Sequence, residues 1–285
     1  MIVITGATGH LGRLVIAALL NKVPPSGIVA AVRNVEKAKD LAALGVQVRC
    51  ADYTLLQTWD DALKGADKVL LISSSEIGQR AKQHRSVIDA AKRKGVKLLA
   101  YTSVLHCETS LLGLAAEHKE TETLIRASGI PCALLRNGWY TENYTAGIPN
   151  ALAYGAVYGC AGEGRIASAA RADYAEAAAA VLTAENQAGR VYELAGDSAY
   201  TLTELAAEIS RQSGKKIGYV NLPEAEYRNV LMKAGLPEAV AALLADSDTG
   251  VSKGALFDDS HQLSKLIGRP TTPMAASVGK VLDKP

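Results

Sequence analysis

The 285-residue sequence lacks the patterns that mark several classes of protein. Its four cysteines, Cys50, Cys107, Cys132 and Cys160, form no Cys-x-x-Cys pair and no Cys/His cluster with zinc spacing. No apolar run is long enough to span a bilayer, and no signal segment precedes the predicted strand at residue 2. The net charge of +2 argues against a polyanionic partner. We therefore expect a cytoplasmic protein with free thiols, no metal, no membrane contact and no nucleic-acid partner.

A common catalytic pair is also missing. In the motif Tyr-x-x-x-Lys, the lysine lowers the pKa of the tyrosine, which then donates a proton to the alkoxide formed during ketone reduction. None of the 11 tyrosines is followed by lysine four residues later. This absence argues against ordinary ketone reduction.

A glycine-rich turn at the start of the chain joins a predicted strand to a predicted helix. Ile2–Ile4 is a β-branched run, and the apolar residues of 11–19 recur with helical spacing. Between them, Gly6 permits a sharp bend, Gly9 lets the backbone approach a pyrophosphate, and Gly12 lets the helix pack closely on the strand. The helix N-terminus presents unpaired N–H groups to the phosphates. The pattern predicts a dinucleotide site, and the alternative is an ordinary α/β turn.

Arg33 follows the second predicted strand, Ile28–Val32, about 20 residues after the last glycine of the turn. Dinucleotide folds place the residue that reads the adenosine ribose there. A guanidinium pairs with a 2′-phosphate, whereas a carboxylate would repel it. Residues 30–34 contain no carboxylate, and the nearest in the sequence is Glu36. The sequence therefore predicts NADP(H) rather than NAD(H), and the alternative is a surface arginine without a partner.

Strands and helices alternate through residues 2–135. We expect further strands at 46–50, 69–72, 98–102 and 132–135, and helices near 35–44, 55–64, 79–94 and 114–128. The alternation predicts an α/β fold, a Rossmann-type doubly wound parallel sheet with helices on both faces. Ligands bind such sheets at the carboxyl ends of the strands. That rule selects Arg33, Asp52, Ser73 to Ser75, Thr102, Ser103 and Arg136 to Tyr140.

The second half of the chain has a different character. Residues 140–164 are rich in Gly, Tyr and Asn and show little helical periodicity, which predicts loops and short turns. Asp173 is predicted to cap an alanine-rich helix, and 191–194 is a predicted strand. From there we expect mostly helix, beginning with a capping box at Thr201 and Glu204. Prolines mark two later helix starts, at positions 223 and 237.

These changes suggest two domains. We expect a Rossmann domain over 1–139, with about 166–198 returning to it. A small, mostly helical substrate-side lobe would then comprise 140–165 and 199–285. The sequence leaves the oligomeric state open, a homodimer included.

Four features together resemble the NmrA-like atypical short-chain dehydrogenase/reductase family: the Gly6–Gly12 turn, Arg33, the strand end Ser73–Ser75 and the segment Leu134–Tyr140. The resemblance covers essentially the whole chain. The glycine turn is shared by a large superfamily, and the last two segments are more specific. Within the family, the chain is most similar to bacterial NADPH-dependent quinone reductases, with triphenylmethane reductases as near relatives.

The motifs, the strand ends and the resemblance together name candidate site residues. The candidates for cofactor binding are Gly6, Ala7, Thr8, Gly9, His10, Leu11, Gly12, Arg33, Asp52, Ser73, Ser74, Ser75, Thr102, Ser103, Asn137, Gly138, Trp139, Tyr140 and Glu142. Trp139, Tyr140 and Tyr144 offer flat apolar surface for a ring-shaped acceptor. The alternative for the first two is a place in the core at a strand end.

His118 and Tyr140 are the candidate catalytic residues. By its spacing from Gly129–Pro131, His118 falls where the related aromatic-ether reductases place a catalytic lysine. A histidine there could bond the nicotinamide ribose or donate a proton. The alternative is a half-buried helix histidine bonded to a backbone carbonyl.

The resemblance implies hydride transfer from NADPH to a quinone, without flavin or metal. A reduced quinone is a phenolate whose conjugate acid has a pKa of about 10, so solvent or a weak acid can protonate it. The missing Tyr-x-x-x-Lys pair is compatible with that reaction, because binding and orientation could supply most of the catalysis. Two alternatives stay open: reduction of bulky cationic dyes, and a regulator that senses NADP(H) without turnover.

Overall fold

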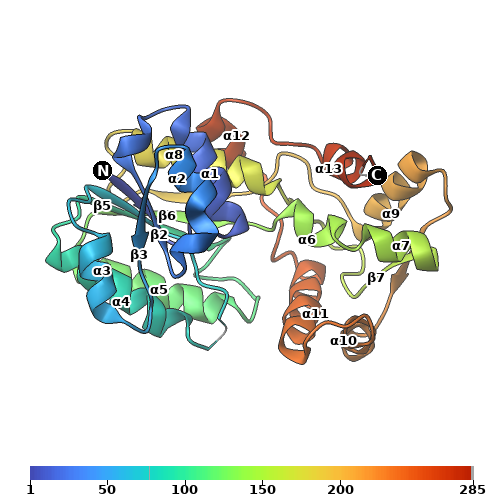
Figure 1. Ribbon diagram of the computed structural model, residues 1–285. Helices are drawn as coiled ribbons and strands as arrows, with labels where there is room; N and C mark the ends of the chain where they lie inside the picture. Colours follow the sequence, from blue (N-terminus) through green and yellow to red (C-terminus); the bar gives the residue numbers. More distant parts are fainter. Residues whose placement is uncertain (77, 284–285) are drawn as a thin grey trace. The chain divides into compact units, whose positions relative to one another are not determined.

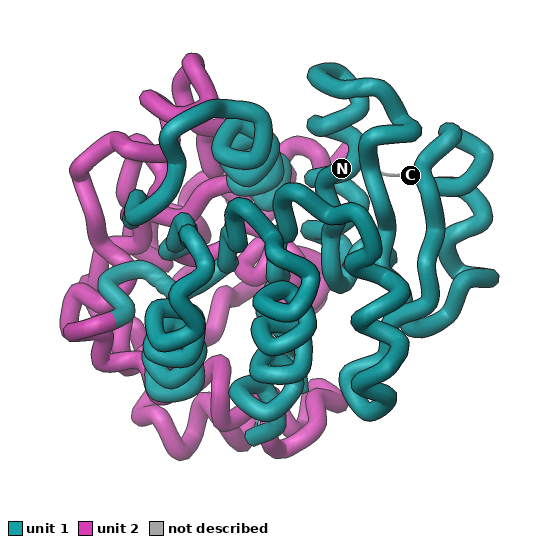
Figure 2. The backbone as a smooth tube through the Cα atoms, turned by 90° about the vertical axis from the view of Figure 1, so that its left-hand side faces the viewer, with its two compact units in different colours: residues 1–107, 116–137, 171–192 teal, residues 108–115, 138–170, 193–285 magenta. Residues whose placement is uncertain are grey.

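The computed structural model describes residues 1–76 and 78–283, and its internal contacts divide them into two compact units (Figure 2). The first unit comprises Met1–Cys107, Ala116–Asn137 and Arg171–Tyr192. The second comprises Glu108–Ala115, Gly138–Ala170 and the described residues from Glu193 onward.

A seven-stranded sheet has the strand order β3-β2-β1-β4-β5-β6-β8 (Figure 1). Its strands are β1 Ile2–Ile4, β2 Ile28–Val32, β3 Gln47–Cys50, β4 Lys68–Leu71, β5 Leu98–Val104, β6 Cys132–Asn137 and β8 Val191–Leu194. The pairs from β3 across to β6 are parallel. Every residue of β1, β2 and β5 is buried, as expected for strands covered on both faces. The predicted Rossmann-type fold is confirmed.

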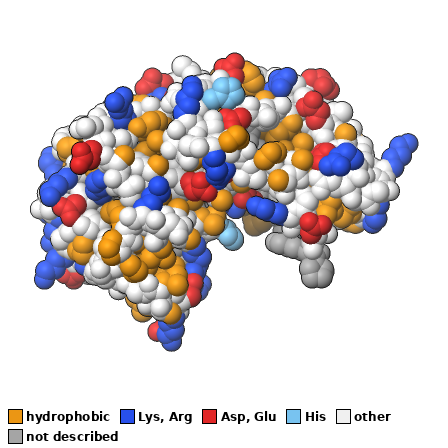
Figure 3. Space-filling view, turned by 90° about the horizontal axis from the view of Figure 1, so that it is seen from above, with side chains coloured by type: hydrophobic (Ala, Val, Ile, Leu, Met, Phe, Trp, Pro, Cys, Tyr) orange, Lys and Arg blue, Asp and Glu red, His pale blue; other side chains and the backbone are white. Residues whose placement is uncertain are grey.

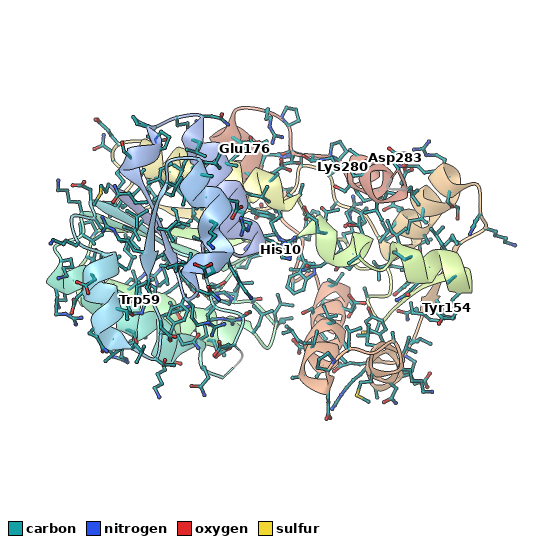
Figure 4. All side chains as sticks on the ribbon, in the orientation of Figure 1. His10, Trp59, Tyr154, Glu176, Lys280 and Asp283 are labelled. Carbon is teal, nitrogen blue, oxygen red and sulfur yellow. The ribbon has the colours of Figure 1, made fainter. Side chains whose placement is uncertain are left out.

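Helices cover both faces of this sheet. They are α1 His10–Leu20, α2 Lys39–Ala43, α3 Leu56–Ala62, α4 Arg80–Arg93, α5 Ala115–Ser128 and α8 Arg171–Thr183, with short 3₁₀ turns at Pro25–Gly27 and Val35–Ala38. Figure 1 shows α1 and α8 on one side and α3, α4 and α5 on the other. On the second side, Trp59 of α3 (labelled in Figure 4) and Tyr101 of β5 are among the largest fully buried side chains. Because such a core is closely packed, it fixes the positions of the strands and of their ends.

The segment 140–164 contains more regular structure than the sequence predicts. It forms α6 Thr141–Thr145, α7 Ile148–Tyr154 and β7 Ala156–Gly159. The two helices are too short to show a repeating apolar face, and α7 buries only two of its residues. β7 pairs in parallel with β9 Gly218–Asn221, and no local pattern can reveal a partner so distant in the sequence.

The remaining helices of the second unit begin mostly where the sequence indicates. They are α9 Leu202–Ser213, α10 Glu224–Lys233, α11 Glu238–Ser252, α12 Gln262–Ile267 and α13 Met274–Leu282. Thr201 and Glu204 form the predicted capping box, and prolines 223 and 237 immediately precede α10 and α11. Asp173 is not an N-cap as predicted, because α8 already begins at Arg171 and Asp173 lies in its first turn.

The two units differ from the predicted domains at residues 108–115, 138–139, 166–170 and 193–198, all of which belong to the second unit. For 108–115 the cause is visible: the N–H of Gly113 donates to Asp246 Oδ2 of α11 at 2.8 Å. All four cysteines are free thiols. Within 1–76 and 78–283, no helix combines the length and apolar character needed to cross a membrane. Figure 3 shows acidic and basic side chains interspersed over the face it presents.

Candidate functional site

The glycine turn has the geometry that the sequence predicts. Gly6 has a φ of +58°, a left-handed conformation that turns the chain sharply after β1. A Cβ on Gly12 would lie 2.5 Å from the carbonyl oxygen of Gly6 and 2.7 Å from Cα of Ala7. The first turn of α1 therefore packs directly against the backbone of the turn, and only glycine fits at residue 12.

The N-terminus of α1 carries no capping side chain. Its N-cap is Gly9, and no acidic residue lies in the first turn. The first N–H groups of a helix have no partner within it, so a ligand oxygen could bond them. His10, labelled in Figure 4, is the first residue of α1 and is exposed. Arg13 of α1 also bonds the turn, because its Nε donates to the carbonyl oxygen of Thr8 at 3.2 Å.

Hydroxyl groups join the carboxyl ends of three neighbouring strands. Thr5 Oγ1, after β1, accepts from the N–H of Ile72, after β4, at 2.9 Å. Thr102 Oγ1 of β5 accepts from the N–H of Ser73 at 2.9 Å. Thr102 is 3% exposed, so its side chain positions Ser73 in this structure. Ser73 is thus fixed to β5.

Ser103 faces a buried ion pair. Its hydroxyl donates to Glu122 Oε1 of α5 at 2.6 Å. Glu122 also accepts two bonds from Arg136, from Nε to Oε1 at 3.0 Å and from Nη2 to Oε2 at 2.7 Å. Burial alone would raise the pKa of Glu122, but the hydrogen bonds from Arg136 and Ser103 outweigh it and hold that pKa below its ordinary value. The sequence does not predict the buried position of Glu122, because a glutamate in a helix ordinarily faces solvent.

His84 of α4, which is not among the predicted site residues, bonds the next residue of the strand end. The N–H of Ser74 donates to Nε2 of His84 at 3.0 Å, so the ring proton is on Nδ1 and is donated to Thr121 Oγ1 at 3.0 Å. Burial, with Arg80 nearby, lowers the pKa of His84 to about 3, which keeps the ring neutral. Arg80 Nε also donates to the carbonyl oxygen of Ser74 at 2.9 Å.

Two polar atoms at the strand ends are buried without a hydrogen-bond partner. They are Ser74 Oγ, after β4, and Asn137 Oδ1, at the end of β6. Buried polar groups are nearly always bonded, so each of these atoms calls for an additional partner. Both residues were predicted from the sequence to bind the cofactor.

His118 lies in α5 and is 5% exposed. Its Nδ1 forms a hydrogen bond of 2.7 Å with the hydroxyl of Tyr101. Burial, followed by the charge of Arg80, lowers the pKa of His118 well below its ordinary value. The ring is therefore neutral at physiological pH, and its partner is a side chain rather than the backbone carbonyl considered above.

Arg33 has a partner that no sequence neighbour provides. Its side chain is 74% exposed, and its Nη1 lies 3.6 Å from Oε1 of Glu76, in the loop after β4. Asp52, also predicted near this position, is turned toward its own loop, because its Oδ1 accepts from the N–H and the hydroxyl of Thr54. These bonds lower the pKa of Asp52. A carboxylate does stand beside Arg33, then, although residues 30–34 contain none.

In the second unit, backbone bonds hold the segment that follows β6. The N–H of Gly138 donates to the carbonyl oxygen of Leu194 at 2.7 Å, and Ala169 exchanges bonds with Trp139 and Thr141. Trp139, Tyr140 and Glu142 are half-buried on this segment. The predicted residues Gly138, Trp139, Tyr140 and Glu142 thus lie on an ordered stretch that leads into α6.

Tyr144 of α6 packs edge-on against Tyr200, with ring centroids 6.3 Å apart. Its hydroxyl oxygen is buried and has no hydrogen-bond partner, and burial raises its pKa well above the ordinary value. Nearby, Asp248 of α11 is 4% exposed and accepts from the N–H of Cys160 at 3.1 Å. Burial raises the pKa of Asp248 to about 6. The sequence reasoning missed Asp248, because an acidic residue in a helix ordinarily faces solvent.

Three comparisons place this geometry among known proteins. The NmrA-like family profile matches residues 1–272. Quinone oxidoreductase 2 of Escherichia coli (strain K12) is 59% identical over 283 residues, which span 99% of each chain. The crystal structure of an Escherichia coli NADPH-dependent quinone oxidoreductase complexed with NADPH superposes with a TM-score of 0.97, covering 99% of this chain and 100% of that one, at 59% identity. A Citrobacter sp. triphenylmethane reductase complexed with NADP(H) gives a TM-score of 0.95 at 40% identity, covering 99% and 100%.

Proposed function

The chain belongs to the NmrA-like family, and from that premise we propose that it is an NADPH-dependent quinone reductase. The observation that carries the proposal is the 59% identity, over essentially the full length of both chains, to a quinone oxidoreductase. The similarity to the triphenylmethane reductase is weaker, at 40% identity. A quinone is therefore the preferred acceptor, and a cationic dye is the second candidate.

The first unit fits an NADPH molecule. The uncapped N-terminus of α1 suits the pyrophosphate, and the exposed guanidinium of Arg33 suits the 2′-phosphate. The unpartnered atoms Ser74 Oγ and Asn137 Oδ1 lie at strand ends, where dinucleotides bind this fold. When bound, NADPH supplies the hydride. The glycine turn and the strand-end residues would hold it.

The protein's own groups would bind and orient the acceptor. Half-buried Trp139 and Tyr140 supply aromatic surface for a quinone ring. Tyr144 is proposed to support that surface through its ring. The neutral ring of His118, with Nδ1 bonded to Tyr101, would use Nε2 to fix a ribose hydroxyl or to pass on a proton. No tyrosine–lysine pair is needed, because a phenolate with a conjugate-acid pKa of about 10 can take its proton from water.

The cytoplasmic location stays part of the proposal, and the four free thiols suit a reducing compartment. The homodimer stays a prediction.

The test is NADPH oxidation by purified protein with a panel of quinones and, in parallel, a cationic triphenylmethane dye. We expect quinone turnover without added flavin or metal, and a kcat/KM for the best quinone above that for the dye. The reverse order would make the dye reductase the better assignment. Tight NADPH binding without turnover of any acceptor would favour a sensor.

A further inference from the structure

The ion pair between Arg33 and Glu76 joins two loops that are distant in the sequence. Arg33 follows β2 and Glu76 follows β4. Nη1 of Arg33 lies 3.6 Å from Oε1 of Glu76. Both side chains are more than half exposed. An exposed pair at this separation contributes little to stability, so folding alone does not account for the carboxylate beside Arg33.

Glu76 is held in this position from its other side. Its Oε2 accepts from Nε2 of Gln83 at 2.6 Å, and Gln83, near the start of α4, is only 8% exposed. The carbonyl oxygen of Glu76 also accepts from the N–H of Gln79 at 3.1 Å. A buried amide thus aims one carboxylate oxygen at the guanidinium, and the negative charge stays near Arg33 when a ligand arrives.

We propose that Glu76 is a specificity-determining residue that weakens binding of the 2′-phosphate of NADPH and so narrows the preference for NADPH over NADH. This inference rests on the proposed function, in which Arg33 binds that phosphate. The carboxylate competes with the phosphate for the guanidinium. The carboxylate would also repel a phosphate bound to Arg33, because it lies 3.6 Å from that guanidinium and the two negative charges would be closer together than the Debye length. NADH has a neutral hydroxyl at that position and meets neither effect.

The opposite effect would be an orienting one, in which Glu76 prepares the guanidinium for the phosphate. The geometry favours competition, because a contact of 3.6 Å at 74% exposure leaves the guanidinium mobile. A phosphate also carries about −1.5 to −2 charges, so its repulsion from a fixed carboxylate exceeds the small gain from ordering one side chain.

The test uses isothermal titration calorimetry with adenosine 2′,5′-bisphosphate and 5′-AMP, which differ in the 2′-phosphate. Glu76→Gln should tighten binding of the bisphosphate by about three- to tenfold and change binding of 5′-AMP by less than about twofold. The gain should shrink between low and high salt. Glu120→Gln, at an exposed position of α5 in the same unit, removes one negative charge elsewhere and should leave both constants unchanged.

Arg33→Ala, measured in parallel, distinguishes a failure of the inference about Glu76 from a failure of the proposed NADPH assignment. If Arg33→Ala weakens the bisphosphate but Glu76→Gln leaves it unchanged or weakens it, this inference is wrong and Glu76 is at most an orienting residue. If Arg33→Ala has no selective effect on the bisphosphate, the proposed cofactor assignment itself fails. Equal tightening by Glu76→Gln and Glu120→Gln would reduce the effect to net charge and would also overturn the inference.

Discussion

At the strand ends of the first unit, the N–H groups of Ser73, Ser74 and Gly78 each donate to a side chain from another element. The buried carboxyls of the two units differ: hydrogen bonds from Arg136 and Ser103 hold the pKa of Glu122 in the first unit below its ordinary value, whereas burial raises the pKa of Asp248 in the second unit to about 6. The first arrangement is a rigid, preorganised frame. The second arrangement leaves a buried carboxyl with a raised pKa, and groups with such shifts tend to lie where they serve a ligand or a titration.

The largest effect is expected from breaking the buried ion pair of the first unit. Glu122→Ala would remove the buried carboxylate that pairs with the guanidinium of Arg136, a residue that is 5% exposed. We expect a loss of about 3–5 kcal/mol in the free energy of unfolding, measured by urea denaturation. Glu120→Ala, on the exposed face of the same helix, should change it by less than about 0.5 kcal/mol. A similar small loss for both variants would mean that the buried ion pair does not stabilise the unit.

The second prediction concerns the titration of Asp248. Its folded-state pKa of about 6 lies above its ordinary value of 3.8, so the folded protein holds the proton more tightly than the unfolded chain does. Stability contributed by this group is therefore lost as the pH rises through that window. Relative to Asp248→Asn, the wild-type free energy of unfolding should fall by about 2–3 kcal/mol between pH 4 and pH 7. A difference that does not change with pH would show that the carboxyl is hydrated.

Removal of the guanidinium of Arg33 tests whether the first unit selects the cofactor. Arg33→Ala should weaken NADPH binding by about ten- to a hundredfold and leave NADH binding nearly unchanged, because only NADPH loses a charge-assisted bond. Fluorescence titration gives both constants. Arg93→Ala removes a half-exposed arginine paired with Asp60 in the same unit and should have no effect. Equal losses for NADPH and NADH would contradict the assignment.

The smallest effect is expected on the acceptor side. Trp139→Ala should raise KM for large quinones by about three- to tenfold and leave kcat less affected, because an aromatic contact is lost. Tyr154→Ala, at the 74% exposed aromatic of α7 labelled in Figure 4, is the matched control and should leave KM unchanged. A fall in kcat at constant KM would instead place Trp139 in the chemical step.

In both units, the separation of the interacting residues along the chain explains how much the sequence could reveal. The Gly6–Gly12 turn and the capping box at Thr201 are local, so their geometry follows from residues close in the sequence. Glu76 reaches Arg33, and Asp248 reaches Cys160, only through the packing of separate elements. Neither contact leaves a periodicity or a spacing that one sequence can show.

His84 illustrates the limit within the better-predicted unit. Its helix was expected near 79–94 and occurs at Arg80–Arg93. Its role depends on the ring reaching the N–H of Ser74, which follows a different strand. The elements and the strand ends were therefore predictable, whereas the side chains that fix those ends were not.

The most direct test of the central claim uses NADPH deuterated stereospecifically at either face of the nicotinamide, with the best quinone as acceptor. If NADPH lies fixed on the first unit and hydride passes directly to the quinone, label from only one face should leave the cofactor. A primary isotope effect should accompany that loss if chemistry limits the rate. Loss of label from both faces, or activity that depends on added flavin, would contradict the account.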